Sequence, residues 1–342
     1  MEITEPDASD ATAGQGFDLA SVQAALALAV RAPSIHNTQP WRWELRPAGL
    51  ALLADRDRQL AVADPDGHSL LLSCGAALTL TELGLRSQGW QVQTGRFPEL
   101  AEPDLLALLQ PVARRAADPA DLELAEAGLR RRSDRRPFRS AELGDDVIEQ
   151  LRAAADGPEV HMHFPVREEE KTNLAVAVSW ADRVERNDPA YVAEMTAWLR
   201  DEHVHADGVT VQVVPRVEPG HPRRTSLPLR DFEIGVTGSV LIEHDVAEHP
   251  LVGVVMTTSD SPLDQLRAGE ATMRLLLQAE LAGVAGCPLS QAVDLLAFRV
   301  RLQTLMGWTG FPQMMLRLGI PAPGEPPPLT PRRPVGDVLR VV

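Results

Sequence analysis

The sequence has few lysines, cysteines and aromatic residues, and each shortage narrows what the protein can be. Lys171 is the only lysine, so arginine supplies almost all of the 33 basic residues. Cys74 and Cys287 are far apart and have no metal-ligand spacing, which argues against a disulfide scaffold and suits buried thiols in a reducing compartment. With 4% aromatic residues, a stacking platform for an aromatic ligand is not obvious.

The charge balance excludes further classes. The formal net charge of −15 argues against a general affinity for nucleic acid or for an anionic membrane. The first ten residues are acidic, without the basic and apolar regions of a signal peptide. No window reaches the 18 or more apolar residues of a membrane span. We therefore expect a soluble, cytoplasmic protein with no nucleic-acid or membrane partner.

With 342 residues, 44% of them hydrophobic, the chain is long enough for two halves of ordinary domain size. Residues 1–16 are small and polar and are expected to be a disordered tail. Periodicity and capping residues predict helices over 18–30, 69–88, from 119, from 145, over 168–207 and over 269–281, and strands over 41–45, 50–54, 90–94, 160–166 and 251–256. Residues 98–120 are punctuated by proline and acidic residues and are expected to contain a short helix.

A polar loop, PSIHNTQPW over 33–41, joins the first expected helix to the first strand. Its two prolines interrupt any helix, and hydrogen-bonding side chains crowd between them. Such a rigid loop suits the recognition of a polar, ring-bearing small molecule. The alternative is an ordinary well-capped turn, because turns are also rich in proline, serine and asparagine.

An arginine run, RRRSDRRPFR over 130–139, places six arginines within ten residues of an acidic protein. It can be a solvated charge run at a helix end, where arginine is favoured by the helix dipole. The embedded serine and the Pro-Phe that ends the run favour a phosphate site instead. The histidine pairs at 161/163 and 203/205 have no zinc-ligand spacing, so no metal is expected. A proline- and arginine-rich loop over 215–230 is typical of a lid or a linker.

The second half of the chain repeats the first. Gly75-x-Ala and Gly269-x-Ala each open an apolar helical stretch that ends at a glycine fourteen positions later. The expected helices after Asp18 and Asp145 also correspond. We assign a first half over 17–118 and a second over 119–342, the latter with an insertion at about 168–235. The first half keeps only the polar loop and the second only the arginine run, which predicts one composite site where the halves meet.

Four motifs resemble the FMN-dependent nitroreductase family: R-R-S-x-R at 131–135, P-S-x-x-N-x-Q-P-W at 33–41, P-L-S-Q at 288–291 and R-R-P at 332–334. The fused and half-degenerate form is similar to the Acg-type branch. The resemblance implies an α+β nitroreductase-like fold in which one chain forms an intramolecular pseudo-dimer and acts as a monomer.

The resemblance also implies FMN between the two halves, with the phosphate held by the arginine run and the C-terminal arginines. The flavin would be lined by residues 33–37, with the backbone at 290 and 291 near its N5 atom. The residues expected to bind FMN are Pro33, Ser34, Ile35, His36, Asn37, Gln39, Arg131, Ser133, Arg135, Pro288, Leu289, Ser290, Gln291, Arg332 and Arg333. No catalytic acid, base or nucleophile is assigned.

Two functions follow from this resemblance. In the first, NAD(P)H reduces FMN, which then reduces a nitro compound, a quinone or another small acceptor. In the second, the 215–230 loop closes over FMN and the protein stores the flavin with little turnover. A non-flavin protein that binds a phosphorylated ligand is the third possibility.

Overall fold

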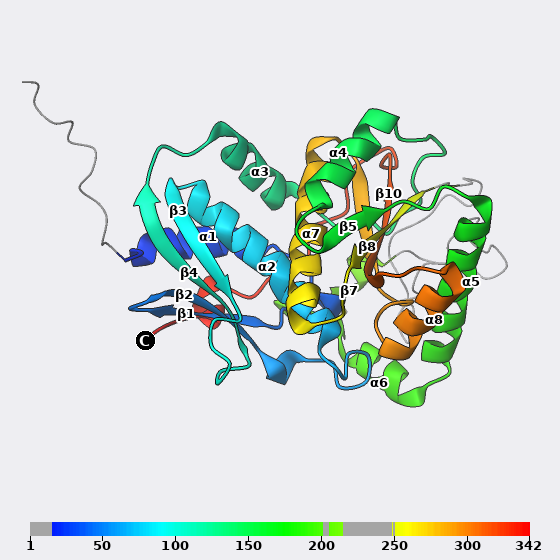
Figure 1. Cartoon of the computed structure of the whole chain (residues 1–342), viewed down its shortest axis with the longest axis horizontal. Helices are drawn as coiled ribbons and strands as arrows, with labels where there is room; N and C mark the ends of the chain where they lie inside the picture. The colour runs from blue at the N-terminus through cyan, green and yellow to red at the C-terminus, as the bar shows by residue number, and fades with distance from the viewer. Residues whose placement is uncertain (1–15, 201–204, 215–247, 249) are drawn as a thin grey trace, which may run out of the picture.

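The computed structural model describes residues 16–200, 205–214, 248 and 250–342. Two mainly antiparallel sheets stand on either side of a central pair of long helices (Figure 1). One cluster of buried side chains extends from the first sheet across both helices to the second sheet, so the two halves share a core.

The first sheet has the strand order β11-β1-β2-β4-β3. Its strands are β1 (Trp41–Arg46), β2 (Gly49–Ala54), β3 (Trp90–Arg96), β4 (Leu105–Arg114) and β11 (Leu339–Val341). In β1 the alternation of Trp41, Arg42 and Trp43 buries both tryptophans and leaves the arginine exposed. β11 comes from the C-terminus and pairs in parallel with β1, so the end of the second half completes the sheet of the first.

The second sheet has the order β5-β8-β10-β9. Its strands are β5 (Val160–His163), β8 (Leu251–Thr257), β9 (Ala285–Leu289) and β10 (Phe311–Gly319). In chain order, this matches β1-β2-β4-β3 strand for strand, and all of the pairings are antiparallel. The predicted repeat is therefore present in the strand order itself.

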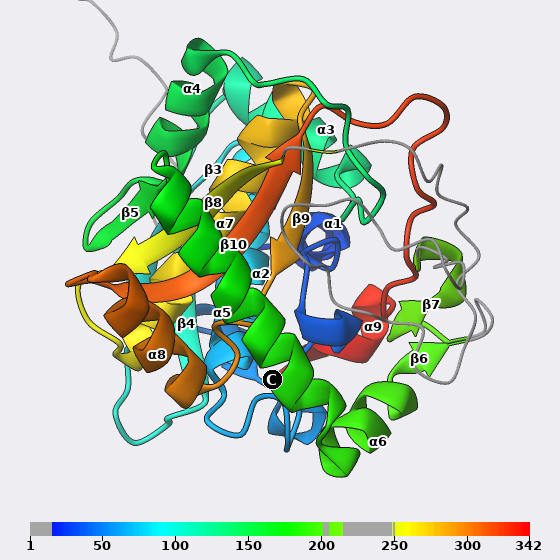
Figure 2. The same ribbon diagram turned by 90° about the vertical axis from the view of Figure 1, so that its right-hand side faces the viewer.

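Helices fill the centre and cover the outer face of the second sheet. They are α1 (Leu19–Ala29), α2 (His68–Arg86), α3 (Pro119–Arg130), α4 (Asp145–Ala155), α5 (Glu168–Arg186), α6 (Pro189–Ala197), α7 (Pro262–Leu281), α8 (Leu296–Met306) and α9 (Val335–Val338). Asp18 caps α1 by accepting from the Ser21 amide at 2.7 Å, as its position predicted. Figure 2 shows α5 and α8 lying in front of the second sheet.

The two central helices, α2 and α7, cross where the repeated glycines lie. A Cβ on Gly75 would approach the Leu266 carbonyl oxygen to 2.0 Å, and one on Gly269 would approach the Leu72 carbonyl oxygen to 2.1 Å. Only glycine permits this backbone approach. The crossing holds the first part of each helix beside the equivalent part of the other.

The extra segment of the second half lies between β5 and β8, where the first half has only the short turn between β1 and β2. It contains α5, α6 and the small parallel pair β6 (Leu199–Arg200) and β7 (Val209–Thr210). The predicted lid over 215–230 falls outside the described residues.

Two expectations are corrected. The segment 98–120 contains the ten-residue strand β4 in place of a short helix. Its leucine- and alanine-rich run has a local preference for helix, but β4 hydrogen-bonds to β2 on one side and to β3 on the other, and this pairing determines its structure. α2 is long and apolar enough to cross a membrane, contrary to the expectation that no such window exists. However, 89% of its most apolar window is buried inside the protein, and α2 is the central core helix.

Candidate functional site: two adjoining cavities between the halves

The polar loop after α1 adopts an unusual backbone. It forms a short 3₁₀ helix, Ile35–Asn37, and three of its residues have left-handed φ angles: His36 at 45°, Asn37 at 55° and Gln39 at 51°. A left-handed conformation costs a non-glycine residue about 1 kcal/mol or more. The surrounding contacts must therefore hold the loop in this form.

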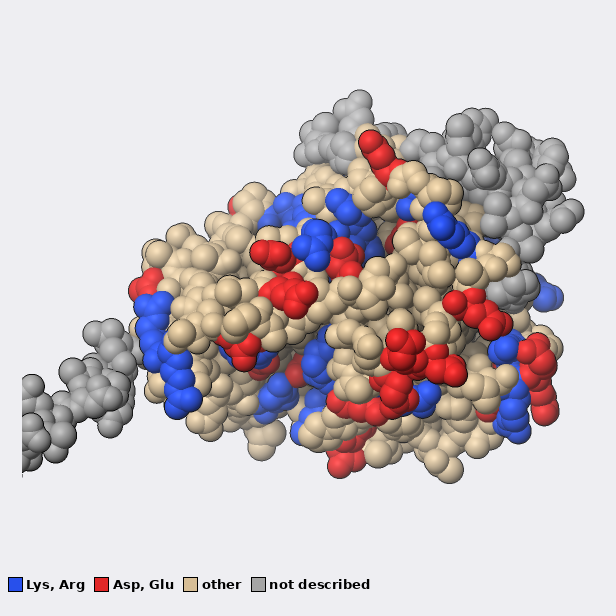
Figure 3. All heavy atoms as spheres, turned by 90° about the horizontal axis from the view of Figure 1, so that it is seen from above, with Lys and Arg blue, Asp and Glu red and all other residues tan. Residues whose placement is uncertain are grey.

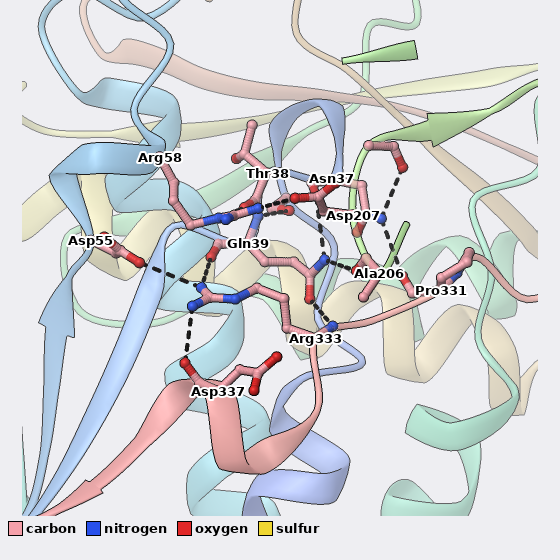
Figure 4. Close-up of polar contacts among 12 residues, drawn as sticks. Asn37, Thr38, Gln39, Asp55, Arg58, Ala206, Asp207, Pro331, Arg333 and Asp337 are labelled. Carbon is pink, nitrogen blue, oxygen red and sulfur yellow. Dashed lines mark hydrogen bonds and ion pairs between the residues drawn. The ribbon is translucent and has the colours of Figure 1, made fainter. Parts of the chain in front are cut away.

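Two other parts of the chain clamp the loop (Figure 4). The Asn37 side-chain amide donates to the Gly208 carbonyl at 2.9 Å and to the Pro331 carbonyl at 3.2 Å. The Gln39 side chain donates to the Ala206 carbonyl at 2.8 Å and accepts from the Arg333 amide at 2.8 Å. The inserted segment and the C-terminal arm thus fix the loop from both sides.

The predicted site residues fall into two groups: two of them belong to this clamp, and the others line the cavities described below. The Arg333 guanidinium donates to the carbonyls of Gln39 and Trp41 and pairs with Asp55 at 3.4 Å. Neither Gln39 nor Arg333 lines the cavities described below. The structure uses both side chains to support the loop.

The first cavity lies between the loop, the crossing of α2 with α7, and the end of β9. It encloses about 930 Å³ of space, part of it open to solvent. It is lined by Pro33, Ser34, Ile35, His36, Ser69, Leu72, Ser73, Ala76, Ser133, Arg135, Gly269, Thr272, Cys287, Pro288, Leu289, Ser290, Gln291 and Met314. Gln291 is 1% exposed and its Nε2 has no hydrogen-bond partner among the described residues, so it offers a buried donor to a ligand.

The second cavity adjoins the first, since Pro33, Ser34, Ser133 and Arg135 line both. It contains about 520 Å³ of space, part of it open to solvent. Five arginines line it, and no carboxylate side chain is among the described residues of its wall. The arginines are Arg31, Arg131, Arg132, Arg135 and Arg332. Asn37 also lies on this wall, and its buried Oδ1 has no hydrogen-bond partner in the described ranges.

Burial and the mutual repulsion of neighbouring guanidinium groups make the charged forms of the arginines in the second cavity unfavourable. Burial, and then the neighbouring Arg31, lower the pKa of Arg131 to about 10. Burial also lowers the pKa of Arg332, with Arg31 and Arg131 adding to the shift. Nε and Nη1 of Arg131 are buried, and the part of the chain that the structure describes gives them no hydrogen-bond partner. An anion placed here would relieve both the charge repulsion and the unpaired donors.

Local structure explains how the arginine run reaches this place. α3 ends at Arg130, and the run then continues alongside β9, where Ser133 forms an isolated parallel bridge with Gly286. The Asp134 amide donates to the Gly286 carbonyl at 3.0 Å, and the Asp134 carboxylate pairs with Arg136 at 2.7 Å. Arg136 thus forms an ion pair with Asp134, and Arg131 and Arg135 lie on the cavity wall.

The structure brings thirteen of the fifteen predicted site residues to the two cavities, Gln39 and Arg333 being the exceptions. It adds Arg31 and Arg132 to the arginine wall. Arg132 lies in the run itself, while Arg31 at the end of α1 carried no motif. It also adds two serines of α2, Ser69 and Ser73.

Cys74 and Cys287 are buried free thiols, as expected. Burial raises the pKa of both thiols, so Cys287 in the cavity wall is not a thiolate.

Curated relatives match this chain in sequence over nearly their whole length. No family model matches the chain. The protein named "Putative NAD(P)H nitroreductase Rv3131" from Mycobacterium tuberculosis is 37% identical over 331 residues, which cover 94% of this chain and 92% of the relative. "Putative NAD(P)H nitroreductase acg" from the same organism is 33% identical over 334 residues, covering 94% and 95%.

Solved structures with a similar arrangement are more distant. A nitroreductase with bound FMN from Bacteroides fragilis has a TM-score of 0.37 and 14% identity, covering 60% of this chain and 91% of its own. A structure titled "putative nitroreductase" from Anabaena variabilis has a TM-score of 0.44 and 11% identity, covering 90% of both chains. The assignment therefore depends on the two sequence relatives, and by their identity and coverage the chain belongs to the Acg-like NAD(P)H nitroreductase family.

Proposed function

We propose that the protein binds one FMN across the two cavities and uses it to carry reducing equivalents from NAD(P)H to a small acceptor such as a nitro compound or a quinone. The observation that carries the proposal is the second cavity, in which five arginines converge without an opposing carboxylate among the described wall residues. A phosphate ester with a charge near −2 matches that wall. The names of the sequence relatives supply the nicotinamide donor.

In this proposal, the arginine wall holds the phosphate. The Nε and Nη1 of Arg131 have no hydrogen-bond partner among the described residues, and its Nη2 donates to the Arg31 carbonyl at 3.1 Å. Arg332 is oriented in the same way by the carbonyls of Thr330 and Pro331. Pre-oriented donors lose little entropy when the anion arrives.

The first cavity would hold the flavin ring. Its wall includes the apolar residues Leu72, Ala76 and Met314, and polar residues that include Ser290 and Gln291 at the end of β9. The buried amide of Gln291 fits a carbonyl or ring nitrogen of the flavin. FMN, when bound, accepts a hydride from one partner and passes it to the next.

The composite position of the site implies that one folded chain suffices for binding, so we propose a monomer that acts as a pseudo-dimer. The polar loop comes from the first half and the arginine run and β9 from the second. A cytoplasmic location and the electron acceptor's identity stay predictions from the sequence.

The competing proposal is storage of FMN with little turnover. It depends on the 215–230 loop, which lies outside the described residues. Stopped-flow mixing of the FMN-loaded protein with NADH or NADPH separates the two functions. We expect bleaching of the oxidised flavin within seconds, followed by reoxidation when a quinone is added. Bleaching only after deletion of residues 215–230 would favour storage, and a protein that takes up no FMN would overturn both.

A further inference from the structure

An ion pair is buried beside the end of the arginine run. Arg317 of β10 is 0% exposed, and Glu248, just before β8, is 3% exposed. The Nη2 of Arg317 donates to the Glu248 carboxylate at 2.8 Å. The ring of Phe138, which belongs to the run, lies against the guanidinium, with the ring centre 3.9 Å from the guanidinium carbon. The pair and the run are therefore in direct contact.

Both members of this pair also bind the backbone of the run. The same Nη2 of Arg317 donates to the Arg136 carbonyl. The Glu248 carboxylate accepts from the Phe138 amide at 2.8 Å. These two backbone groups lie on either side of Pro137, which has no amide hydrogen of its own to donate. The pair thus fixes the chain before and after the proline.

The other end of this segment is attached to β9, through the bridge of Ser133 with Gly286 and the hydrogen bond from the Asp134 amide. The segment is therefore held by β9 at one end and, through Arg317, by β10 at the other. Arg135 lies between the two attachments and lines both cavities, as Ser133 does. Neither Arg317 nor Glu248 lines either cavity, so the pair can act on a ligand only through the run.

Stability alone does not account for such a pair. Apolar residues of similar volume often replace a buried ion pair with no loss of stability, because removing two charges from water is costly. The Nε and Nη1 of Arg317 are buried, and no hydrogen-bond partner for them lies in the residues that the structure describes. What apolar residues cannot do is bind a carbonyl and an amide of the run at the same time. The pair is suited to fixing one conformation of the run.

We propose that the pair of Arg317 with Glu248 is a positioning device that holds Arg135 and Ser133 at the phosphate of the flavin, and so sets the preference for FMN over riboflavin. This inference rests on the proposed binding of FMN. Riboflavin has the same ring system but no phosphate. Loosening the run should therefore weaken the binding of FMN and leave that of riboflavin unchanged.

The test removes both charges together, so that neither is left buried alone. Apoprotein of Arg317→Met with Glu248→Leu is titrated with FMN and with riboflavin, and the two dissociation constants are read from flavin fluorescence. We expect the dissociation constant of FMN to rise roughly tenfold or more, as is typical when the support of a binding residue is lost. Riboflavin should bind as it does to the wild type.

A matched control removes the ion pair that occupies the closed side of the α2–α7 crossing. The Nε and Nη2 of Arg96 donate to the Glu270 carboxylate, and neither residue lines a cavity. Arg96→Met with Glu270→Leu should keep the wild-type ratio of the two dissociation constants. Phosphorus NMR adds a readout that a general change in stability does not move. The phosphate resonance of bound FMN should shift in the Arg317/Glu248 variant and stay in place in the control.

A single variant carries the test if the double one does not fold. Arg317→Lys keeps the positive charge, but an ammonium cannot reproduce the planar contact with Phe138, so the preference for FMN should fall by a few-fold. Variants that keep the wild-type preference, or that bind FMN and riboflavin more weakly by the same factor, would overturn the positioning role alone. A wild-type protein that takes up no FMN, or binds riboflavin as tightly, would overturn the proposed phosphate site and this inference with it.

Discussion

The two halves of the molecule have the same strand order, but equivalent positions line an open cavity on one side and form an ion pair on the other. Gly75 and Gly269 mark equivalent points of α2 and α7, 194 positions apart in the sequence. The same offset relates Ala76 to Glu270 and Arg96 to Ser290. Ala76 and Ser290 line the first cavity. At the equivalent place, the Nε and Nη2 of Arg96 each donate to the Glu270 carboxylate at 2.7 Å.

The difference teaches how one of two sites in a duplicated fold becomes closed. A small residue and a hydroxyl leave space on one side of the α2–α7 crossing. A bidentate ion pair, with the Glu270 side chain 6% exposed, fills the other side. The polar loop and the arginine wall also occur on the open side only. We infer one site per chain, and the following predictions test this contrast in order of decreasing effect.

Replacing Arg131 by methionine should have the largest effect, on FMN binding. Two charge-assisted hydrogen bonds to the phosphate are removed, each contributing about 1.5–3 kcal/mol. We expect the dissociation constant measured by flavin fluorescence quenching to rise by roughly a hundredfold or more. The double change Arg131→Ala with Arg135→Ala should abolish FMN retention while the fold persists.

The matched control is Arg130→Met in the same run, since Arg130 is exposed and pairs with Glu280 outside the cavity. It should bind FMN like the wild type. The apoprotein of Arg131→Met should unfold no more easily than the wild type, because the substitution removes a buried charge that burial and Arg31 disfavour. Equal FMN affinity in the two variants would contradict the phosphate assignment.

Breaking the ion pair of the closed side should have the next largest effect, on stability. Arg96→Ser leaves the Glu270 carboxylate buried without its partner, which should cost about 2–4 kcal/mol of unfolding free energy in denaturant titration. Burial already raises the pKa of Glu270. Its raised folded-state pKa means that the variant loses stability as pH rises above the ordinary range of glutamate.

Changing both partners at once sharpens the contrast. Arg96→Ser with Glu270→Ala gives the closed side the residues of the open side and should be less destabilised than Arg96→Ser alone, because no charge remains buried. It should still bind one FMN, since the closed side has no arginine wall. A second bound FMN would show that the ion pair alone closes that site.

The sequence reveals the open side better than the closed one, for a physical reason. The loop at 33–41 and the run at 130–139 are short contiguous motifs. Their side-chain chemistry can therefore be recognised in the sequence before the fold is known. The ion pair of Arg96 with Glu270 joins residues far apart in the chain, and only packing brings them together. A polar residue in a motif also does not reveal whether it binds a ligand or another part of the protein. Gln39 and Arg333, for example, hydrogen-bond to each other and stabilise the loop.

The buried acid Asp64 should make stability depend on pH. Its folded-state pKa, about 7, is above its ordinary value of 3.8, so the folded state holds a proton that the unfolded state has released. Stability should be fully present below about pH 4 and fall, by a few kcal/mol at most, as pH rises to about 7. The slope of unfolding free energy against pH should be shallower in Asp64→Asn. The same slope in both proteins would contradict the assignment.

The smallest effect is expected at the clamp. Asn37→Ala leaves the carbonyls of Gly208 and Pro331 without this donor and places a less tolerant residue at a φ of 55°. We expect a loss of about 1–3 kcal/mol in thermal or denaturant unfolding. FMN affinity should weaken less than in Arg131→Met. A larger loss of affinity than in Arg131→Met would place the main ligand contact on the loop.

The most direct measurement is the number of FMN molecules bound per chain. Apoprotein is titrated with FMN and the end point is read from fluorescence quenching, for the wild type and for Arg131→Met. One FMN per chain, lost in Arg131→Met and kept in Arg130→Met, is the result that a single composite site predicts. Two FMN per chain, or one that Arg131→Met still binds tightly, would contradict it.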